Sequence, residues 1–184
     1  LDNMKLVNDL LWDNLTTYDD MFDDDSFAKI ITTLQEPKWE YGHTSYHHTD
    51  PNYALCSKFW KRDLSDDLFF TDYLLNKIQE KTQQSFTLEH VYANGHTYGL
   101  DGIFHQDHYD EHGRTFLLYA NAQWANEWGG GTQFYTDDTE LRTVMFQPNR
   151  GMLFPGVVYH SAAPTTRLFN DLRITVAWKL TKNE

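Results

Sequence analysis

The chain has 184 residues, the length of one ordinary domain, so it can bury a sizeable core without disulfides or a structural metal. Its 15 basic and 27 acidic residues give a formal charge of −12, which disfavours nucleic acid and anionic membrane surfaces as partners. No apolar run approaches the about 20 residues that a membrane-spanning helix needs.

The cysteine content bears on the cellular compartment. Cys56 is the single cysteine and cannot form an internal disulfide, and no basic and apolar leader opens the chain. We therefore expect a cytoplasmic protein. The acidic balance also mildly favours a cationic or neutral substrate over a polyanion.

The first third of the chain predicts helices. The stretch "DDDSFAKIITTLQEP" has Ser26 as a candidate N-cap, acidic residues that suit the helix dipole, and Pro37 where the helix should end. The stretch "LSDDLFFTDYLLNKIQEKTQQ" has Ser65 as a second candidate cap, and its apolar residues from Leu68 to Ile78 recur at helical spacing. We expect an amphipathic helix there that covers a sheet.

From Phe86 onward, short β-type runs alternate with turn residues, which predicts an antiparallel sandwich or barrel. The sequence therefore indicates one α+β, mainly β domain over residues 1–184, with an N-terminal helical buttress over about 1–85 and a β core over about 86–181. The β-type runs are "FTLEHVYA", "TFLLYANAQW", "GGTQFY", "RTVMFQP", "GMLFP", "VVYHSAA" and "LRITVAWKL".

The stretch "GIFHQDHYDEHG" contains candidate metal ligands. If "GIFHQD" ends a strand, alternation makes His105 and Asp107 project together while Gln106 points away. His160 lies late in another predicted strand, and a sandwich could bring it opposite. Two imidazoles and one carboxylate that leave one face of the ion open are typical of non-haem Fe(II) oxygenases.

Other side chains compete for a metal, because the chain has nine histidines. The competitors are His108, Asp110 and His112 in the polar run before Gly113, and His43, His47 and His48 in the turn-rich segment "HTSYHHTDPNYAL". We expect the first group in a mobile loop, and no predicted strand holds the second.

The C-terminal strand "DLRITVAWKL" separates two kinds of residue by alternation. Trp178 shares one face with the aliphatic side chains, so we expect it in the core. Arg173, Thr175 and Lys179 share the other face. A guanidinium fork with an adjacent hydroxyl suits a carboxylate bound inside a barrel.

Five motifs in order resemble the iron- and 2-oxoglutarate-dependent dioxygenases, in particular the prolyl 4-hydroxylase-like branch. They are "FHQD", "LLYAN", "WGGGTQFY", "PNRGMLFPGVVYHSA" and "LRITVAWKL", and they cover about half of the chain. The resemblance implies a double-stranded β-helix, or jelly-roll, core. Carried over by position, it makes His105, Asp107 and His160 the catalytic iron ligands, Arg173, Thr175 and Tyr119 the partners of the distal 2-oxoglutarate carboxylate, and Tyr92 a neighbour of the cosubstrate pocket.

The chain departs from the family pattern at two places. The segment before His105 is long, so Tyr98 competes with Tyr92, and "PTTRLFNDLR" offers Arg167 as a rival to Arg173. Candidate substrate-binding residues are His96, Tyr98 and Asp101.

The resemblance implies an Fe(II) enzyme with 2-oxoglutarate and O2 as cosubstrates and ascorbate as an optional auxiliary. It would hydroxylate an unactivated C–H bond in a peptidyl proline or a small molecule. Asp107 fills the position that related halogenases leave to chloride, which favours hydroxylation. The alternatives are a cupin-like zinc or manganese enzyme without 2-oxoglutarate, and a non-catalytic β-sandwich binding module. The sequence does not indicate an oligomeric state.

Overall fold

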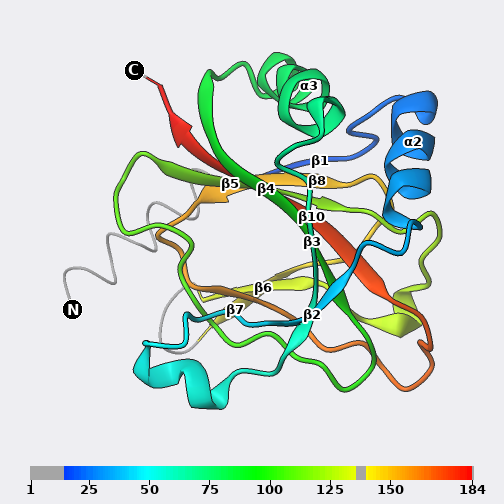
Figure 1. Ribbon diagram of the computed structural model, residues 1–184, viewed down its shortest axis with the longest axis vertical. Helices are drawn as coiled ribbons and strands as arrows, with labels where there is room; N and C mark the ends of the chain where they lie inside the picture. The colour runs from blue at the N-terminus through cyan, green and yellow to red at the C-terminus, as the bar shows by residue number, and fades with distance from the viewer. Residues whose placement is uncertain (1–14, 136–139, 184) are drawn as a thin grey trace.

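The protein consists of two antiparallel sheets and a pair of helices in a computed structural model that describes residues 15–135 and 140–183 (Figure 1). In these residues the large sheet has seven strands in the order β1-β8-β5-β10-β4-β3-β2, and the small sheet has three in the order β7-β6-β9. The large sheet contains β1 (Thr16–Tyr18), β2 (Glu40–His43), β3 (Phe59–Asp63), β4 (Phe86–His96), β5 (Gly113–Tyr119), β8 (Gly151–Pro155) and β10 (Arg173–Lys182).

The small sheet contains β6 (Thr132–Tyr135), β7 (Leu141–Val144) and β9 (His160–Ala162). The helices are α2 (Asp24–Leu34) and α3 (Leu74–Thr82), with single-turn segments η1 (Pro51–Leu55), η2 (Phe69–Tyr73) and η3 (Asn126–Trp128). Each β-type run predicted after Phe86 overlaps one of the strands β4 to β10, so the mainly β jelly-roll core that we expected is confirmed.

The two faces of the large sheet have different partners. Helices α2 and α3 cover one face, where Ile30, Ile78 and Trp178 are fully buried in one apolar cluster. On the opposite face, Tyr119 of β5 packs with Phe134 of the small sheet in a second cluster. Arg173, Thr175 and Lys179 of β10 alternate with Trp178, so they face away from the helices and line a cavity.

The first predicted helix is present as α2, but its N-cap is Asp23 and not Ser26. The Asp23 carboxylate accepts hydrogen bonds from the Ser26 N–H (2.8 Å) and from the Ser26 hydroxyl (3.0 Å). Asp and Ser are both good caps, and the third residue after the cap has the N–H that the cap side chain reaches. Ser26 therefore lies inside the first turn.

The second predicted helix starts later than expected. Ser65 is not its cap: the Asp67 carboxylate instead accepts from the Phe69 N–H (2.9 Å), and a π-turn precedes α3. The buried side chains Phe70, Leu74 and Ile78 are four residues apart, and Leu68, two residues before Phe70, lies on the other side and is 76% exposed. The apolar face therefore starts after Leu68.

The segment expected to be a helical buttress also contributes strands. Within residues 15–85, β1 pairs with β8, β3 pairs with β4, and β2 pairs with β3. Residues 1–14 lie outside the described part of the chain. These strands are short and polar, and long-range hydrogen bonds hold them in place, so local periodicity does not reveal them. Among the described residues, no helix combines the length and the apolar character that crossing a membrane requires.

The Trp178 side chain joins the helices to the sheet, which gives a stability prediction. It is fully buried, and its indole N–H donates to the Phe70 carbonyl oxygen (3.0 Å). We expect Trp178→Ala to lower the free energy of unfolding by about 3–5 kcal/mol, because it leaves a large cavity. Leu68→Ala is the control on an exposed site and should change stability by less than about 0.5 kcal/mol. Urea unfolding measures both; equal losses would contradict this packing.

Candidate metal centre

Two histidines from distant segments are held together by backbone hydrogen bonds. The His105 N–H donates to the His160 carbonyl oxygen and the His160 N–H donates to that of His105, both at 3.0 Å. The expected strand at "GIFHQD" is therefore reduced to a single β-bridge. That bridge is enough to place the two imidazole rings 4.6 Å apart.

The orientation of both rings is set by nearby carbonyl groups. His105 Nδ1 lies 2.8 Å from the Ile103 carbonyl oxygen, and His160 Nδ1 lies 2.9 Å from that of Val158. A carbonyl oxygen can only accept, so each Nδ1 carries a proton and Nε2 is the ring atom left to bind a metal. Hydrogen bonds of this kind fix the tautomer of metal-binding histidines.

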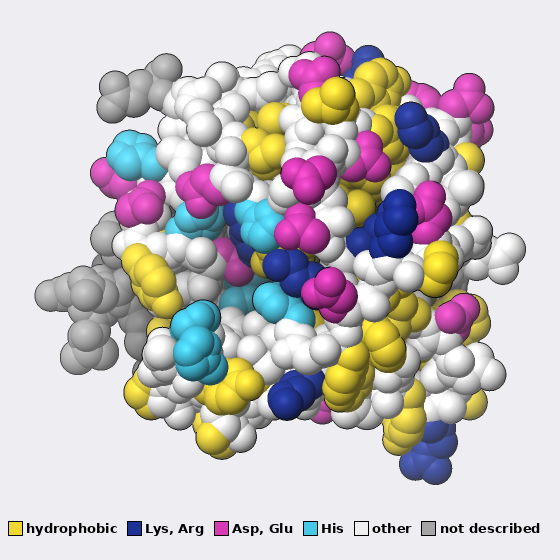
Figure 2. Space-filling model, in the orientation of Figure 1, with side chains coloured by type: hydrophobic (Ala, Val, Ile, Leu, Met, Phe, Trp, Pro, Cys, Tyr) yellow, Lys and Arg dark blue, Asp and Glu magenta, His cyan; other side chains and the backbone are white. Residues whose placement is uncertain are grey.

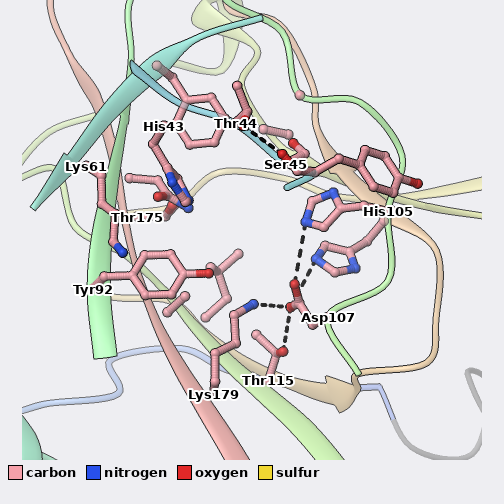
Figure 3. Close-up of a pocket in the computed structure, with 18 of the residues that line it drawn as sticks. His43, Thr44, Ser45, Lys61, Tyr92, His105, Asp107, Thr115, Thr175 and Lys179 are labelled. Atoms are coloured by element: carbon pink, nitrogen blue, oxygen red, sulfur yellow. Dashed lines mark hydrogen bonds and ion pairs between the residues drawn. The ribbon is translucent and has the colours of Figure 1, made fainter. Parts of the chain in front are cut away.

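Asp107 completes the cluster. Its carboxylate oxygens lie 3.5 Å from His105 Nε2 and 3.3 Å from His160 Nε2, and the three ligand atoms are all within 4.8 Å of one another (Figure 3). The Thr115 hydroxyl donates to one oxygen at 2.6 Å. This donor set, two imidazoles and one carboxylate, suits a divalent iron site.

A buried lysine shares the Asp107 carboxylate. The Lys179 ammonium forms an ion pair with Asp107 and a hydrogen bond with Tyr92. Burial raises the pKa of Asp107, but the charge of Lys179 and the contacts with both histidines outweigh it and hold that pKa well below its usual range. Burial alone would lower the pKa of Lys179, yet Asp107 and Tyr92 raise it. Asp107 is thus an anion, as a carboxyl group must be to bind a metal.

The same cavity, about 650 Å³ in volume, contains Arg173 at its other end. Arg173 is 1% exposed, and its Nε donates to the Gly130 carbonyl oxygen at 2.6 Å. Gly130 has φ +72°, and a Cβ there would lie 2.9 Å from Trp124 Cζ2 and 3.2 Å from Arg173 Cδ, which explains the glycine at this position. Within residues 15–135 and 140–183, no carboxylate forms an ion pair with this guanidinium. Burial lowers the pKa of Arg173 to about 10, with Tyr119 opposing the shift.

Polar atoms beside Arg173 also lack partners. Asn94 Oδ1 and both ring nitrogens of His96 are buried without a hydrogen bond. In the pairing of β4 with β10, His96 is opposite Arg173 and Asn94 is opposite Thr175. Buried polar groups in native proteins are nearly always hydrogen-bonded, so this end of the cavity fits a small anion with several oxygens, such as 2-oxoglutarate.

The structure separates the predicted tyrosines and arginines. Tyr92 lines the cavity, whereas Tyr98 is 56% exposed and lies outside it. The Tyr119 hydroxyl donates to the Val144 carbonyl oxygen (2.8 Å) and contacts the Thr132 hydroxyl (2.9 Å), so its ring lies beneath Arg173 and its hydroxyl does not reach the cavity. Asp101 and Arg167 are exposed and do not line the cavity.

The competing histidines do not join the three ligands. His108 was expected in a mobile loop, but it is 9% exposed, because Gly113 and Gly156 leave room for its ring. His112 is exposed. His43, His47 and His48 lie at the mouth of the cavity, and burial lowers the pKa of His43 to about 4. Among the described residues, the cluster able to hold a metal consists of His105, Asp107 and His160.

Sequence reasoning missed two lysines of the cavity. Lys179 was placed on the Arg173 face by alternation, and that shared face was the signal that could have identified it. Lys61 lies on β3, a strand that the sequence did not reveal. Figure 2 shows the cavity mouth as a hollow among histidine, lysine and acidic side chains.

Comparisons with known proteins agree with this architecture. No family model and no curated protein matches the sequence. A prolyl hydroxylase from Trichoplax adhaerens, solved with a hypoxia-inducible-factor peptide fragment, superimposes with a TM-score of 0.68 and 13% identity, covering 98% of this chain and 91% of its own. A Pseudomonas putida prolyl-4-hydroxylase gives 0.65 and 13%, covering 97% and 100%.

A third structure is HygX from Streptomyces hygroscopicus, with nickel, 2-oxoglutarate and hygromycin B bound. It has a TM-score of 0.61 and 10% identity, covering 98% of this chain and 87% of its own. The chain therefore has the fold of the 2-oxoglutarate and Fe(II) oxygenases. The resemblance read from its motifs is confirmed at the level of the fold.

The ligand geometry predicts which variants lose a metal. We expect Asp107→Ala and His160→Ala to weaken Mn(II) or Fe(II) binding by on the order of 100-fold or more, since removal of mere supporting partners already costs 10- to 100-fold. His108→Ala should keep its metal affinity, and His112→Ala is an exposed control for the loss of an imidazole. Anaerobic titration calorimetry measures all four. An equal loss in the His108 variant would contradict the assignment.

Proposed function

We propose that the chain is an Fe(II)- and 2-oxoglutarate-dependent dioxygenase that hydroxylates an unactivated C–H bond. The observation that carries the proposal is one cavity with a two-histidine, one-carboxylate cluster and a buried arginine that has no acidic partner among the described residues. When bound, iron and 2-oxoglutarate supply oxidative decarboxylation by O2, with CO2 and succinate as products and one oxygen atom delivered to the substrate.

The metal ligands are His105, Asp107 and His160. The carbonyl oxygens that hold each histidine Nδ1 keep both rings in the orientation for binding through Nε2. Thr115 and Lys179 hold the Asp107 carboxylate and keep it ionised, so no rotation or deprotonation is needed before the metal binds.

The cosubstrate end of the cavity is built on β10 and β4. Arg173 offers a bidentate fork to the distal carboxylate of 2-oxoglutarate, and Thr175 adds a hydroxyl two residues away on the same face. Asn94 and His96 face this end and gain hydrogen bonds when it is occupied, so we assign His96 to the cosubstrate and not to the substrate. Tyr119 is a positioning residue, because its ring lies beneath the guanidinium.

The substrate reaches the metal through the mouth of the cavity. The neighbours with this fold were solved with a peptide fragment in one case and with hygromycin B in the other. A peptidyl or small-molecule substrate is consistent with both. We assign Tyr92, and not Tyr98, to the cavity wall. Tyr98 and Asp101 do not line the cavity, so we no longer assign them to the substrate. The use of O2, an ascorbate requirement and a cytoplasmic location remain predictions.

The alternative functions lack an equivalent observation. A cupin-like zinc or manganese enzyme would not need a buried Arg173 without an acidic partner, and a binding module would not need three ionisable groups aimed at one point. The direct test is anaerobic addition of Fe(II) and 2-oxoglutarate, which should produce the weak visible charge-transfer band of the chelate. Admission of O2 should then yield succinate. Absence of both signals would contradict the proposal.

The choice of arginine gives the next prediction. Arg173→Lys keeps the charge but loses the planar fork, so the 2-oxoglutarate concentration for half-maximal band intensity should rise about tenfold or more, while Fe(II) affinity is retained. Arg167→Lys is the matched control at an exposed site and should change neither. A weakened Arg167 variant beside an unaffected Arg173 variant would show that the cosubstrate binds elsewhere.

The identity of Asp107 predicts the product. A carboxylate occupies the coordination position that a halide would need, so the product should be hydroxylated at any chloride concentration. Mass spectrometry of reactions run in chloride and in acetate buffers measures this. A chlorinated product from the wild-type protein would overturn the prediction.

A further inference from the structure

Four basic side chains surround the ring of Tyr92 at the mouth of the cavity. The Lys61 and Lys179 ammonium groups lie 4.8 Å and 5.7 Å from the ring centroid, and the rings of His43 and His90 lie 5.8 Å and 5.2 Å from it. These residues come from β2, β3, β4 and β10, so the tertiary fold alone brings them together. Figure 3 shows Lys61, Lys179 and Tyr92 on one side of the cavity, facing the metal ligands.

Three acidic groups near the mouth have partners, and two of these partners, Lys179 and His90, belong to the basic group itself. Asp107 is a metal ligand, Asp63 contacts His90 Nε2 at 3.1 Å, and Glu89 accepts from the Thr181 hydroxyl and lies 3.8 Å from His108 Nδ1. Within the described part of the chain, no carboxylate forms an ion pair with Lys61. Lys61 therefore presents a positive charge at the mouth that no carboxylate of the described residues pairs with, in a protein whose formal charge is −12.

This charge is separate from the cosubstrate anchor. Arg173 and Lys179 are six residues apart on β10, about 20 Å along a strand that rises about 3.3 Å per residue. This separation applies to the backbone only, because the Lys179 ammonium reaches Asp107 among the metal ligands. Lys61 comes from β3 and is the cation at the mouth that belongs neither to the Arg173 anchor nor to the Asp107 pair.

We infer that the substrate of this site carries an oxyanion group, a carboxylate or a phosphate, that is bound by Lys61 and Lys179 beside Tyr92. This inference rests on the proposed oxygenase function and adds the substrate class to it. Each ammonium offers three N–H donors, and Lys179 has used two of them, on Asp107 and Tyr92. The Tyr92 ring adds an apolar wall beside the charged group.

The local charge replaces the earlier expectation of a cationic or neutral substrate. That expectation was based on net charge, which governs long-range steering. Contacts within a cavity are governed by the few charges that line it, because solvent screens the others over about 8 to 10 Å. Lys61 and Lys179 line the cavity, while most of the acidic residues do not.

The test uses the protein loaded anaerobically with Fe(II) and 2-oxoglutarate, with sulfate as the probe for a phosphate group and acetate as the probe for a carboxylate. Titration calorimetry at constant ionic strength should detect binding of at least one probe. The probe that binds with the higher affinity identifies the oxyanion as a phosphate-like group or a carboxylate. Lys61→Gln should weaken that binding about tenfold, and Lys61→Arg should restore it, because the charge is kept.

Lys58→Gln is the matched control, because it removes an exposed lysine three residues earlier. It should keep the wild-type affinity for the probe. Equal affinity in wild type and Lys61→Gln, no binding of either probe, or displacement of the probe by further 2-oxoglutarate would each overturn the inference. The visible band of the same samples tests the function separately: a band without probe binding leaves the oxygenase proposal intact, and no band contradicts that proposal instead.

Discussion

Strand alternation in β10 is the constraint on which both the core and the site depend. This strand lies between β5 and β4 in the large sheet, so both of its faces are covered. Val176, Trp178 and Leu180 are buried against the helices, and Arg173 and Lys179 point into the space between the sheets. A shift of one residue would put two charges into the apolar core, so the register of the sheet and the position of the site are set together.

Burial of these two charges has a different solution at each end of the strand. Lys179 is neutralised by Asp107, and the pair holds the carboxylate ionised next to two histidines. Arg173 has backbone carbonyl groups and aromatic rings around it, but no carboxylate from the part of the chain that the structure describes. A buried guanidinium without a carboxylate is costly, and binding of an anion relieves that cost. The arrangement therefore couples the stability of this end of the cavity to its ligand.

The metal cluster depends on very little regular structure. One β-bridge between His105 and His160, together with a hydrogen bond from the Asp107 N–H to the Gly156 carbonyl oxygen (2.8 Å), brings the three ligands together. The Tyr46 hydroxyl holds the backbone just before His105, because it donates to the Phe104 carbonyl oxygen at 2.8 Å. We expected a regular strand to bring the ligands together. Backbone hydrogen bonds made by a loop bring the same side chains together instead.

The sequence by itself determined the β-type runs after Phe86, the paired positions of His105 and Asp107, and the two faces of "LRITVAWKL", because each of these depends on local spacing or periodicity. Tertiary structure decided the rest. Lys61 reached the cavity through a strand without a periodic signal, His108 was buried by two distant glycines, and Tyr119 turned its hydroxyl away from the cavity toward Val144. Such outcomes depend on contacts between residues far apart in the chain, and no local pattern encodes them.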